Sequence, residues 1–433
     1  MFSETENQLR DKLFEKHSDS FFDLVDGRRE PCEWDGAEFP PLSFVLKRET
    51  ERRINKILDK IQHVQLYAKE IPLIRGDGPP TRIDLLGGSE RAGIVIIELK
   101  KSNQTERQAF TEILAYSNHF CLTFPGLTEA GIVSVLVAPM LGRTVRDAYI
   151  QELLINRKDV LVLCQNDLND SPRFSVYYPT EESYAPYNNI LLNDQVMSCI
   201  TISFQQLPGR VEFVDGIKED TGFHLTADFL NHLSSEVSIS LERLGFHALV
   251  YCVQKDRNCY NQDPALPNIL IVAAINPFAL ASLSLPSDGE PRRTLSYKSL
   301  AERIALDPLE GEWIDRLNVS HEGRLQKTVI ETFDFLLRSK DDEIRREIDA
   351  PSWTEIKWSN STSIDVIYFG CQATGMLKSV LLQYIEDAYE QGHEKFGYFD
   401  DLPLHACEMT NNARAVLIIL DGLGGQHNSV NCS

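Results

Sequence analysis

The first 180 residues alternate between two hydrophobic periods, which predict a run of helices and strands. Apolar residues recur at helical spacing in 46–62 and again in 105–120. Between these two segments lie extended stretches at 64–74, 82–86 and 93–99, separated by glycine-rich turns, and a short β-branched run at 132–137 follows the second helix. The predicted order is therefore helix, three strands, helix, strand, extended by a helix at 144–156 and strands at 160–164 and 174–178.

The pattern after residue 180 predicts a second α/β domain. Residues 181–215 are loop-rich, so we place a linker there, between a first domain at 45–180, preceded by an extension at 1–44, and a second domain at 216–433. The second domain is predicted to contain helices at 226–244, 299–306, 324–340 and 376–390, and strands at 248–253, 269–274, 364–369 and 415–420. No motif in it indicates a particular chemistry.

Composition places the chain among ordinary globular proteins. Its 433 residues are 42% hydrophobic and 25% charged, which excludes the composition of a disordered chain, and the length fits two or three domains. The start lacks the charged and apolar regions of a secretory signal, and no apolar run approaches the roughly 18 residues that span a bilayer. Nine cysteines occur without a CxxC pair, as is typical of free thiols. We therefore expect a cytoplasmic protein in a reducing compartment, with no membrane partner.

The net charge of −21 argues at first against a nucleic-acid partner, because phosphates are bound by surplus lysine and arginine. That acidity is unevenly distributed, however. Residues 41–150 contain 15 Lys and Arg against 12 Asp and Glu, a net of +3, so the remaining residues carry −24. A charge of +3 predicts weak, salt-sensitive binding of nucleic acid by this segment and leaves the acidic remainder as a candidate regulator.

Three charged residues interrupt the buried strands of the first domain. Glu98 and Lys100 alternate with apolar residues at the end of one strand, so they project from the same face. Asp84 interrupts the preceding strand and is placed to converge with Glu98 across the turn. Two carboxylates and a lysine form a hard-oxygen site suited to Mg²⁺, in which the ammonium stabilises a phosphate or orients a water. The spacing therefore favours phosphodiester hydrolysis.

The Glu-x-Lys pattern alone has little weight, and the chain contains its own control. Glu355-Ile356-Lys357 repeats the spacing without a buried strand leading into it or an aspartate strand before it, so we expect a solvated segment there. The alternative interpretation of Glu98 and Lys100 is an ion pair on an edge strand. That alternative leaves unexplained the aspartate strand, the apolar lead-in and the flanking helices.

One motif runs from Arg82-Ile83-Asp84-Leu85-Leu86 through Glu98-Leu99-Lys100 to Gln108 and Tyr116. In this order on the predicted elements, the motif resembles the PD-(D/E)XK nuclease superfamily. It is most similar to the RecB-like and NucS-like nuclease domains. The resemblance covers residues 45–140, about a third of the chain or less. It implies a restriction-endonuclease-like αβββαβ core in the N-terminal part, with an α/β second domain of unrecognised type.

The resemblance also implies roles for individual residues. Asp84, Glu98 and an acidic residue on the first helix would bind Mg²⁺ or Mn²⁺; Glu51 fits that last position best, and Glu49 is the competitor. Lys100 would be the catalytic lysine, and Gln108 would brace the site or contact the substrate.

The function implied is a Mg²⁺-dependent nuclease, with defence or repair as its candidate setting and with DNA favoured over RNA on family grounds. The alternative is a non-catalytic module that binds nucleic acid or protein and keeps the nuclease fold. A third hypothesis is a nuclease held silent until a partner releases it. The second domain would serve recognition, regulation or dimerisation, so the candidate partners beside nucleic acid are a second copy of the chain and a regulatory protein.

Overall fold

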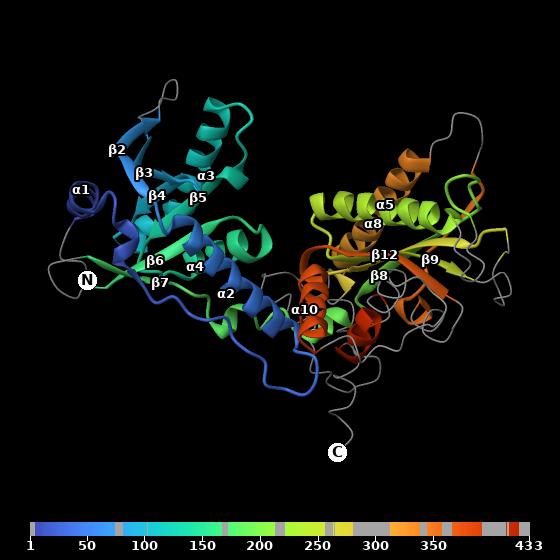
Figure 1. The fold of residues 1–433 in the computed structure, drawn as a ribbon. Coiled ribbons are helices and arrows are strands. Elements are labelled where there is room, and N and C mark those ends of the chain that lie inside the picture. The colour runs from blue at the N-terminus through green and yellow to red at the C-terminus, as the bar shows by residue number, and fades with distance from the viewer. Residues whose placement is uncertain are drawn as a thin grey trace, which may run out of the picture. The chain divides into compact units, whose positions relative to one another are not determined.

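The computed structural model describes residues 5–73, 81–101, 103–166, 172–212, 221–255, 263, 265–279, 312–337, 344–356, 366–391, 413 and 415–423. The chain divides into two compact units (Figure 1). Unit 1 comprises residues 1–37 and 46–186, and unit 2 comprises residues 38–45 and 187–433. Both units combine helices with a β-sheet, as the hydrophobic pattern predicts. No helix in the described ranges is both long enough and apolar enough to cross a bilayer.

Unit 1 contains a seven-stranded mixed sheet in the order β1-β7-β6-β5-β4-β3-β2. β2, β3 and β4 are antiparallel neighbours, while β4, β5 and β6 run parallel to one another. The elements are α1 (Glu6–His17), β1 (Val25–Asp26), α2 (Leu42–Ile61), β2 (Gln65–Leu73), β3 (Thr81–Ser89), β4 (Gly93–Leu99), α3 (Asn103–Thr123), β5 (Ile132–Val137), α4 (Arg143–Ile150), β6 (Val160–Asn166) and β7 (Arg173–Val176). The predicted order of helix, three strands, helix and strand is therefore confirmed by α2 through β5.

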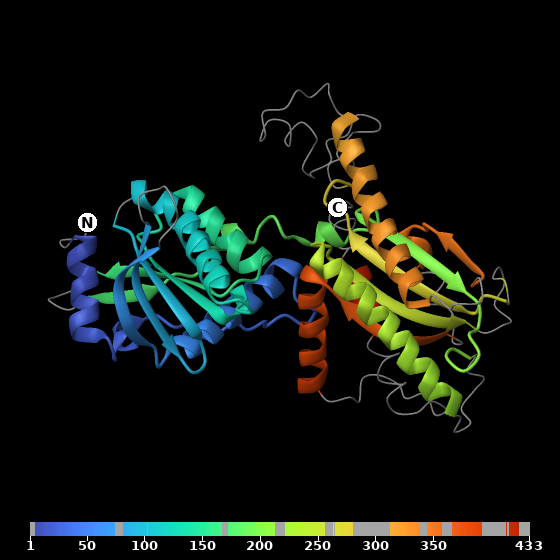
Figure 2. The same ribbon diagram turned by 90° about the horizontal axis from the view of Figure 1, so that it is seen from above.

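Helices α2 and α3 lie on opposite faces of this sheet (Figure 2). Ile96 of β4 packs with Tyr116 and Phe120 of α3, whereas the next residue, Ile97, lies in a larger cluster that contains Ile54 of α2 and also the first apolar residues of α3. Adjacent strand positions point to opposite faces, so each helix covers one face.

Unit 2 is built on a five-stranded antiparallel sheet in the order β11-β8-β10-β9-β12. Its elements are β8 (Met197–Phe204), α5 (Thr221–Arg243), β9 (Ala248–Lys255), β10 (Asn268–Ile275), α8 (Glu312–Leu337), β11 (Arg346–Asp349), β12 (Val366–Ala373) and α10 (Gly375–Gln391). Helices α5 and α8 pack together on one face of this sheet (Figure 1). β8 lies inside 181–215, the stretch interpreted as a linker.

The prediction of a strand at 415–420 is wrong, because the described residues 415–423 are helical. The buried positions Ala413, Val416, Leu417, Leu420 and Leu423 recur at intervals of three and four, which is a helical period. A short apolar run does not by itself distinguish a strand from a buried helix. The helix predicted at 299–306 lies outside the described residues.

Gly370 allows β12 to approach α5 closely. It lies where the pairing of β12 with β9 shifts register, and its φ of +55° is in the left-handed region. A Cβ at this position would lie 2.9 Å from Asn231 Cα and 2.7 Å from Ser234 Oγ. Backbone conformation and space therefore both require glycine here.

We expect Gly370→Ala to destabilise the chain more than Gly245→Ala does. Gly245 also has a positive φ, +77°, but a Cβ added there would meet no atom within 4 Å, so its substitution costs only the conformational term of about 1–2 kcal/mol. Gly370→Ala should cost roughly 1–3 kcal/mol more, because the new methyl group overpacks the interface with α5. Urea unfolding of both variants measures the difference; equal losses would contradict the packing argument.

Candidate active site

The ladder between β3 and β4 ends at an acidic side chain. The last registered pair is Leu85 with Ile97, and beyond it Asp84 Oδ2 accepts the main-chain N–H of Leu99 at 2.9 Å. A carboxylate thus takes the place that a main-chain carbonyl would occupy in a continued ladder. The two strands separate at this point, and the side chain of Asp84 reaches from β3 to β4.

Glu98 and Lys100 lie next to this separation, as the alternation along β4 predicts. Lys100 Nζ is 2.6 Å from Glu98 Oε1, and the Glu98 side chain is only 3% exposed. The other oxygen, Glu98 Oε2, is buried and accepts no hydrogen bond from the described residues. A buried carboxylate oxygen without a donor is costly, so this atom marks a position where a cation or a proton would be stabilising.

Glu112 of α3 completes the surroundings of Lys100. Its Oε2 lies 2.6 Å from Lys100 Nζ, so the ammonium is held between two carboxylates and is 11% exposed. One helical turn further on, the hydroxyl of buried Tyr116 donates to the main-chain oxygen of Arg82 at 2.8 Å. α3 thereby contributes two residues to the site and ties itself to β3.

The pKa values in the site are shifted by burial and by neighbouring charge. Burial raises the pKa of Glu98, and the negative charge of Asp84 raises it further. Burial also raises the pKa of Asp84, against the lowering effects of the Leu99 N–H and of Lys100. For Lys100, burial favours the neutral form, but the carboxylates of Glu98 and Glu112 outweigh it and raise its pKa. Lys100 is therefore held as an ammonium, unsuited to act as a general base.

The donor set fits a magnesium ion bound mainly by substrate and water. Within the described ranges no three or more His, Cys, Asp or Glu side chains are grouped to hold a metal. Mg²⁺ is commonly held by one or two carboxylates together with waters and phosphate oxygens. Asp84 and Glu98 are two such carboxylates, and the unpaired Oε2 of Glu98 is available as a ligand.

Glu51 does not join this group, which corrects the prediction. It lies on α2, where its Oε2 accepts the N–H of Cys32 at 2.8 Å, and none of its described contacts is with Asp84, Glu98 or Lys100. Its helical spacing relative to the buried stripe of α2 does predict its burial, but α2 covers the face of the sheet away from α3. The competitor Glu49 pairs instead with Arg157 at 3.1 Å.

Gln108 is exposed near the beginning of α3. It lies four residues before Glu112 and eight before Tyr116, so the three residues share one face of the helix. The structure gives Gln108 no described contact with Asp84, Glu98 or Lys100. Glu112 is not among the residues predicted from the sequence, although its four-residue spacing from Gln108 was a usable signal.

The first residue of the second Glu-x-Lys pattern, Glu355, is exposed to solvent, as the sequence predicts. Glu355 is exposed in a short helix, where its Oε2 accepts the N–H of Ser352 at 2.7 Å and that hydrogen bond lowers the pKa of Glu355. Lys357 lies outside the described residues. Glu355 is therefore a matched control for Glu98.

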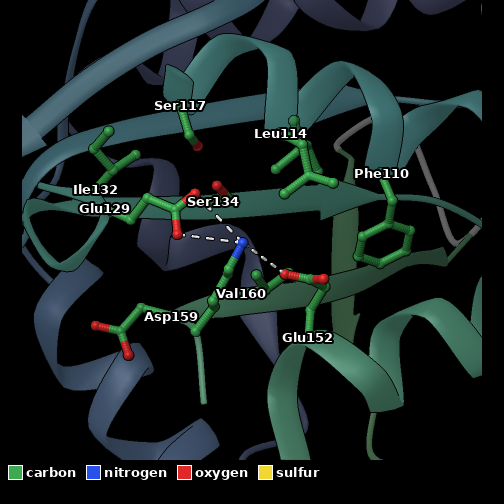
Figure 3. Close-up of a pocket in the computed structure, with 11 residues that line it drawn as sticks. Phe110, Leu114, Ser117, Glu129, Ile132, Ser134, Glu152, Asp159 and Val160 are labelled. Carbon is green, nitrogen blue, oxygen red and sulfur yellow. Dashed lines mark hydrogen bonds and ion pairs between the residues drawn. The ribbon is translucent and has the colours of Figure 1, made fainter. Parts of the chain in front are cut away.

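A pocket lined by polar and apolar residues lies at the other end of the parallel strands (Figure 3). Glu129 and Glu152 flank it and pair with Lys158 at 3.3 Å and 3.1 Å. It is lined by Ile132 and Val160, the first residues of β5 and β6, whereas Glu98 is near the last residue of β4. Its charges are paired across a small space, which is typical of a structural ion-pair cluster.

Comparisons of this chain with protein-family models, with curated proteins and with solved structures found no match.

We expect Glu98→Gln to stabilise the fold when divalent cations are removed by EDTA. The raised pKa means that ionised Glu98 opposes folding, so its cost is absent below the ordinary carboxyl pKa and grows as the pH rises toward the folded-state pKa. The gain should be roughly 1–3 kcal/mol at about pH 8 and smaller at about pH 5. Thermal unfolding at both pH values measures it. Glu355→Gln should give no gain, and a destabilised Glu98→Gln would contradict this description of the site.

A second prediction concerns Glu51 and Cys32. Burial and the carboxylate of Glu51 raise the pKa of the Cys32 thiol to about 11. Glu51→Gln removes the negative charge, lowers that pKa and increases the thiolate fraction. Alkylation of Cys32 by iodoacetamide at about pH 8 should therefore accelerate by about 3–10-fold. Peptide mass spectrometry measures the alkylation rate, with the half-buried Cys121 as the internal control. An unchanged alkylation rate at Cys32 would contradict the contact between Glu51 and Cys32.

Proposed function

We propose that this chain is a nuclease that hydrolyses phosphodiester bonds with a divalent metal ion, and that DNA is its substrate in preference to RNA. The observation that carries the proposal is the meeting of Asp84, Glu98 and Lys100 at the separated ends of β3 and β4. The order of α2 through β5 is the order expected of a restriction-endonuclease-like core and supports the same proposal.

Asp84 and Glu98 would hold Mg²⁺ or Mn²⁺. When bound, the metal supplies Lewis acidity, which polarises the scissile phosphate and lowers the pKa of a coordinated water. The two carboxylates repel each other, so a cation bound between them is favoured. Because the site is largely buried, their charges act in a medium of low dielectric constant, where they attract a cation more strongly than in water.

Lys100 stabilises the negative charge that develops on the phosphate. Glu98 and Glu112 keep it protonated and restrict the position of Nζ, so the ammonium is oriented before substrate binds. Gln108, exposed on the same face of α3 as Glu112, is placed to contact the substrate. A cytoplasmic location stays a prediction, as do the roles of unit 2 in recognition, regulation or dimerisation.

The test is cleavage of single- and double-stranded DNA and RNA by the wild type and by Glu98→Gln, Lys100→Ala and Asp84→Asn. We expect activity with Mg²⁺ or Mn²⁺, none with EDTA, and a loss of about 100-fold or more in each variant. Asp84→Asn and Glu98→Gln would each remove the charge of a metal ligand, and Lys100→Ala would remove the cation that stabilises the phosphate. Glu355→Gln, the matched control, should retain full activity. Cleavage that persists undiminished in Glu98→Gln and Lys100→Ala would overturn the proposal.

Binding without cleavage would favour the alternative, a non-catalytic module that keeps the fold. Activity that appears only after a partner protein is added would instead support a nuclease held silent on its own. Gel-shift measurements of the same variants with the same oligonucleotides separate these outcomes, because loss of turnover and loss of binding are then recorded independently.

A further inference from the structure

The N-terminal helix α1 lies beside β2 and β3 (Figures 1 and 2). Thr5 and Gln8 form a capping box that fixes its first turn. Within that turn, Glu6 Oε1 accepts the N–H of Lys101 at 2.7 Å. Since Lys101 directly follows Lys100, this hydrogen bond joins the beginning of α1 to the segment that carries the proposed catalytic lysine.

Arg10 extends from α1 to the carboxylate of Asp84. Its side chain is 8% exposed, and its Nη1 lies 3.8 Å from Asp84 Oδ1. The other oxygen of Asp84, Oδ2, accepts the N–H of Leu99. Asp84 Oδ2 is thus fixed by a hydrogen bond from β4, while the charge of Arg10 faces Oδ1 from α1 at ion-pair distance.

Glu70 of β2 holds Arg10 in turn. Its Oε1 lies 3.0 Å from Arg10 Nη2, while Asn7 Oδ1 accepts a hydrogen bond from Arg10 Nη1 at 3.1 Å. Glu70 has a φ of 51°, a left-handed conformation that costs a non-glycine residue about 1–2 kcal/mol. Such strain persists where the surrounding contacts require it, and it is often found beside functional sites.

Neighbouring ion pairs attach the same helix to the same strand. Lys69 Nζ lies 2.9 Å from Asp11 Oδ1 and 3.1 Å from Glu15 Oε1. Arg82 Nη1 also approaches Glu70, at 3.8 Å, from β3. α1 is thus attached along its length, and the buried Arg10 is its contact with the proposed metal ligand.

We propose that Arg10 is a positioning residue of the site and that Glu70 acts through it: the pair orients Asp84 for the metal ion. This inference rests on the proposed metal-dependent function. A guanidinium suits the task, because its planar fork contacts Asn7 and Glu70 while its charge faces Asp84 at 3.8 Å, whereas an ammonium is a single point of charge. α1, outside the αβββαβ order, is then a component of the site.

The experiment measures Mn²⁺ binding by calorimetry, independently of cleavage, for full-length Arg10→Gln, Glu70→Gln and Lys16→Gln. Arg10→Gln should raise the Kd for Mn²⁺ by about 10-fold, as is usual when the partner that orients a metal ligand is lost, and should lower kcat in cleavage assays. Glu70→Gln should shift both in the same direction by less. Lys16→Gln removes an equal charge from an exposed position of the same helix and should stay within about twofold of wild type.

Two further variants separate positioning from charge and from folding. Arg10→Lys retains the charge but not the fork, so its Mn²⁺ affinity should remain below that of wild type. The double variant Arg10→Gln/Glu70→Gln should bind Mn²⁺ no more weakly than Arg10→Gln alone, since Glu70 acts through Arg10. Arg82→Gln is the control for the second partner of Glu70. If Arg10→Gln does not fold, the partly exposed Glu70→Gln tests the same contact.

Unchanged Mn²⁺ affinity in Arg10→Gln and Glu70→Gln, alongside loss of binding in Asp84→Asn, would overturn the positioning role and leave the nuclease proposal standing. Additive losses in the double variant would also contradict it. Failure of the nuclease proposal gives a different result: Mn²⁺ binding that depends on Asp84 and Arg10, with no nucleic acid cut. A wild type that binds no Mn²⁺ would overturn both.

Discussion

The carboxyl group of Glu98 imposes the main constraint on unit 1, because it is buried at the end of a hydrophobic strand beside a second carboxyl group. Its side chain is 3% exposed, and one of its oxygens is left without a donor among the described residues. Lys100 compensates the other oxygen, and Glu112 fixes Lys100 in turn. An arrangement of this kind opposes folding unless a cation or a proton neutralises it, and residues that oppose folding are commonly retained for function.

Packing around this group explains why elements distant in sequence meet there. β3 and β4 separate where Asp84 replaces a main-chain acceptor, and both α3 and the beginning of α1 contact the residues that follow β4. Ion pairs in this location are stronger than on the surface, since less water screens them. The same low dielectric makes each unpaired group costly, so the cluster is held by several partners at once.

Local patterns in the sequence were sufficient to predict the secondary-structure elements of unit 1 and part of the site. Alternation along β4 places Glu98 and Lys100 on one face, and helical spacing defines α2 and α3 within a few residues. Glu51 shows the limit: spacing shows that it is buried but not which residues it meets, which depends on the segment around Cys32. Arg10 lies 74 residues from its partner Asp84, so no local pattern around either residue indicates that they meet. The prediction of a strand at 415–420 was wrong because a short apolar run fits both the helix period and the strand period.

A divalent cation shared by Asp84 and Glu98 is the central claim, and diffraction from crystals grown with Mn²⁺ tests it most directly. An anomalous difference map should show one Mn²⁺ peak in coordination contact with carboxylate oxygens of both residues, with the Oε2 atom of Glu98 among its ligands. A peak bound elsewhere, or saturating Mn²⁺ with no peak between these two carboxylates, would contradict the claim.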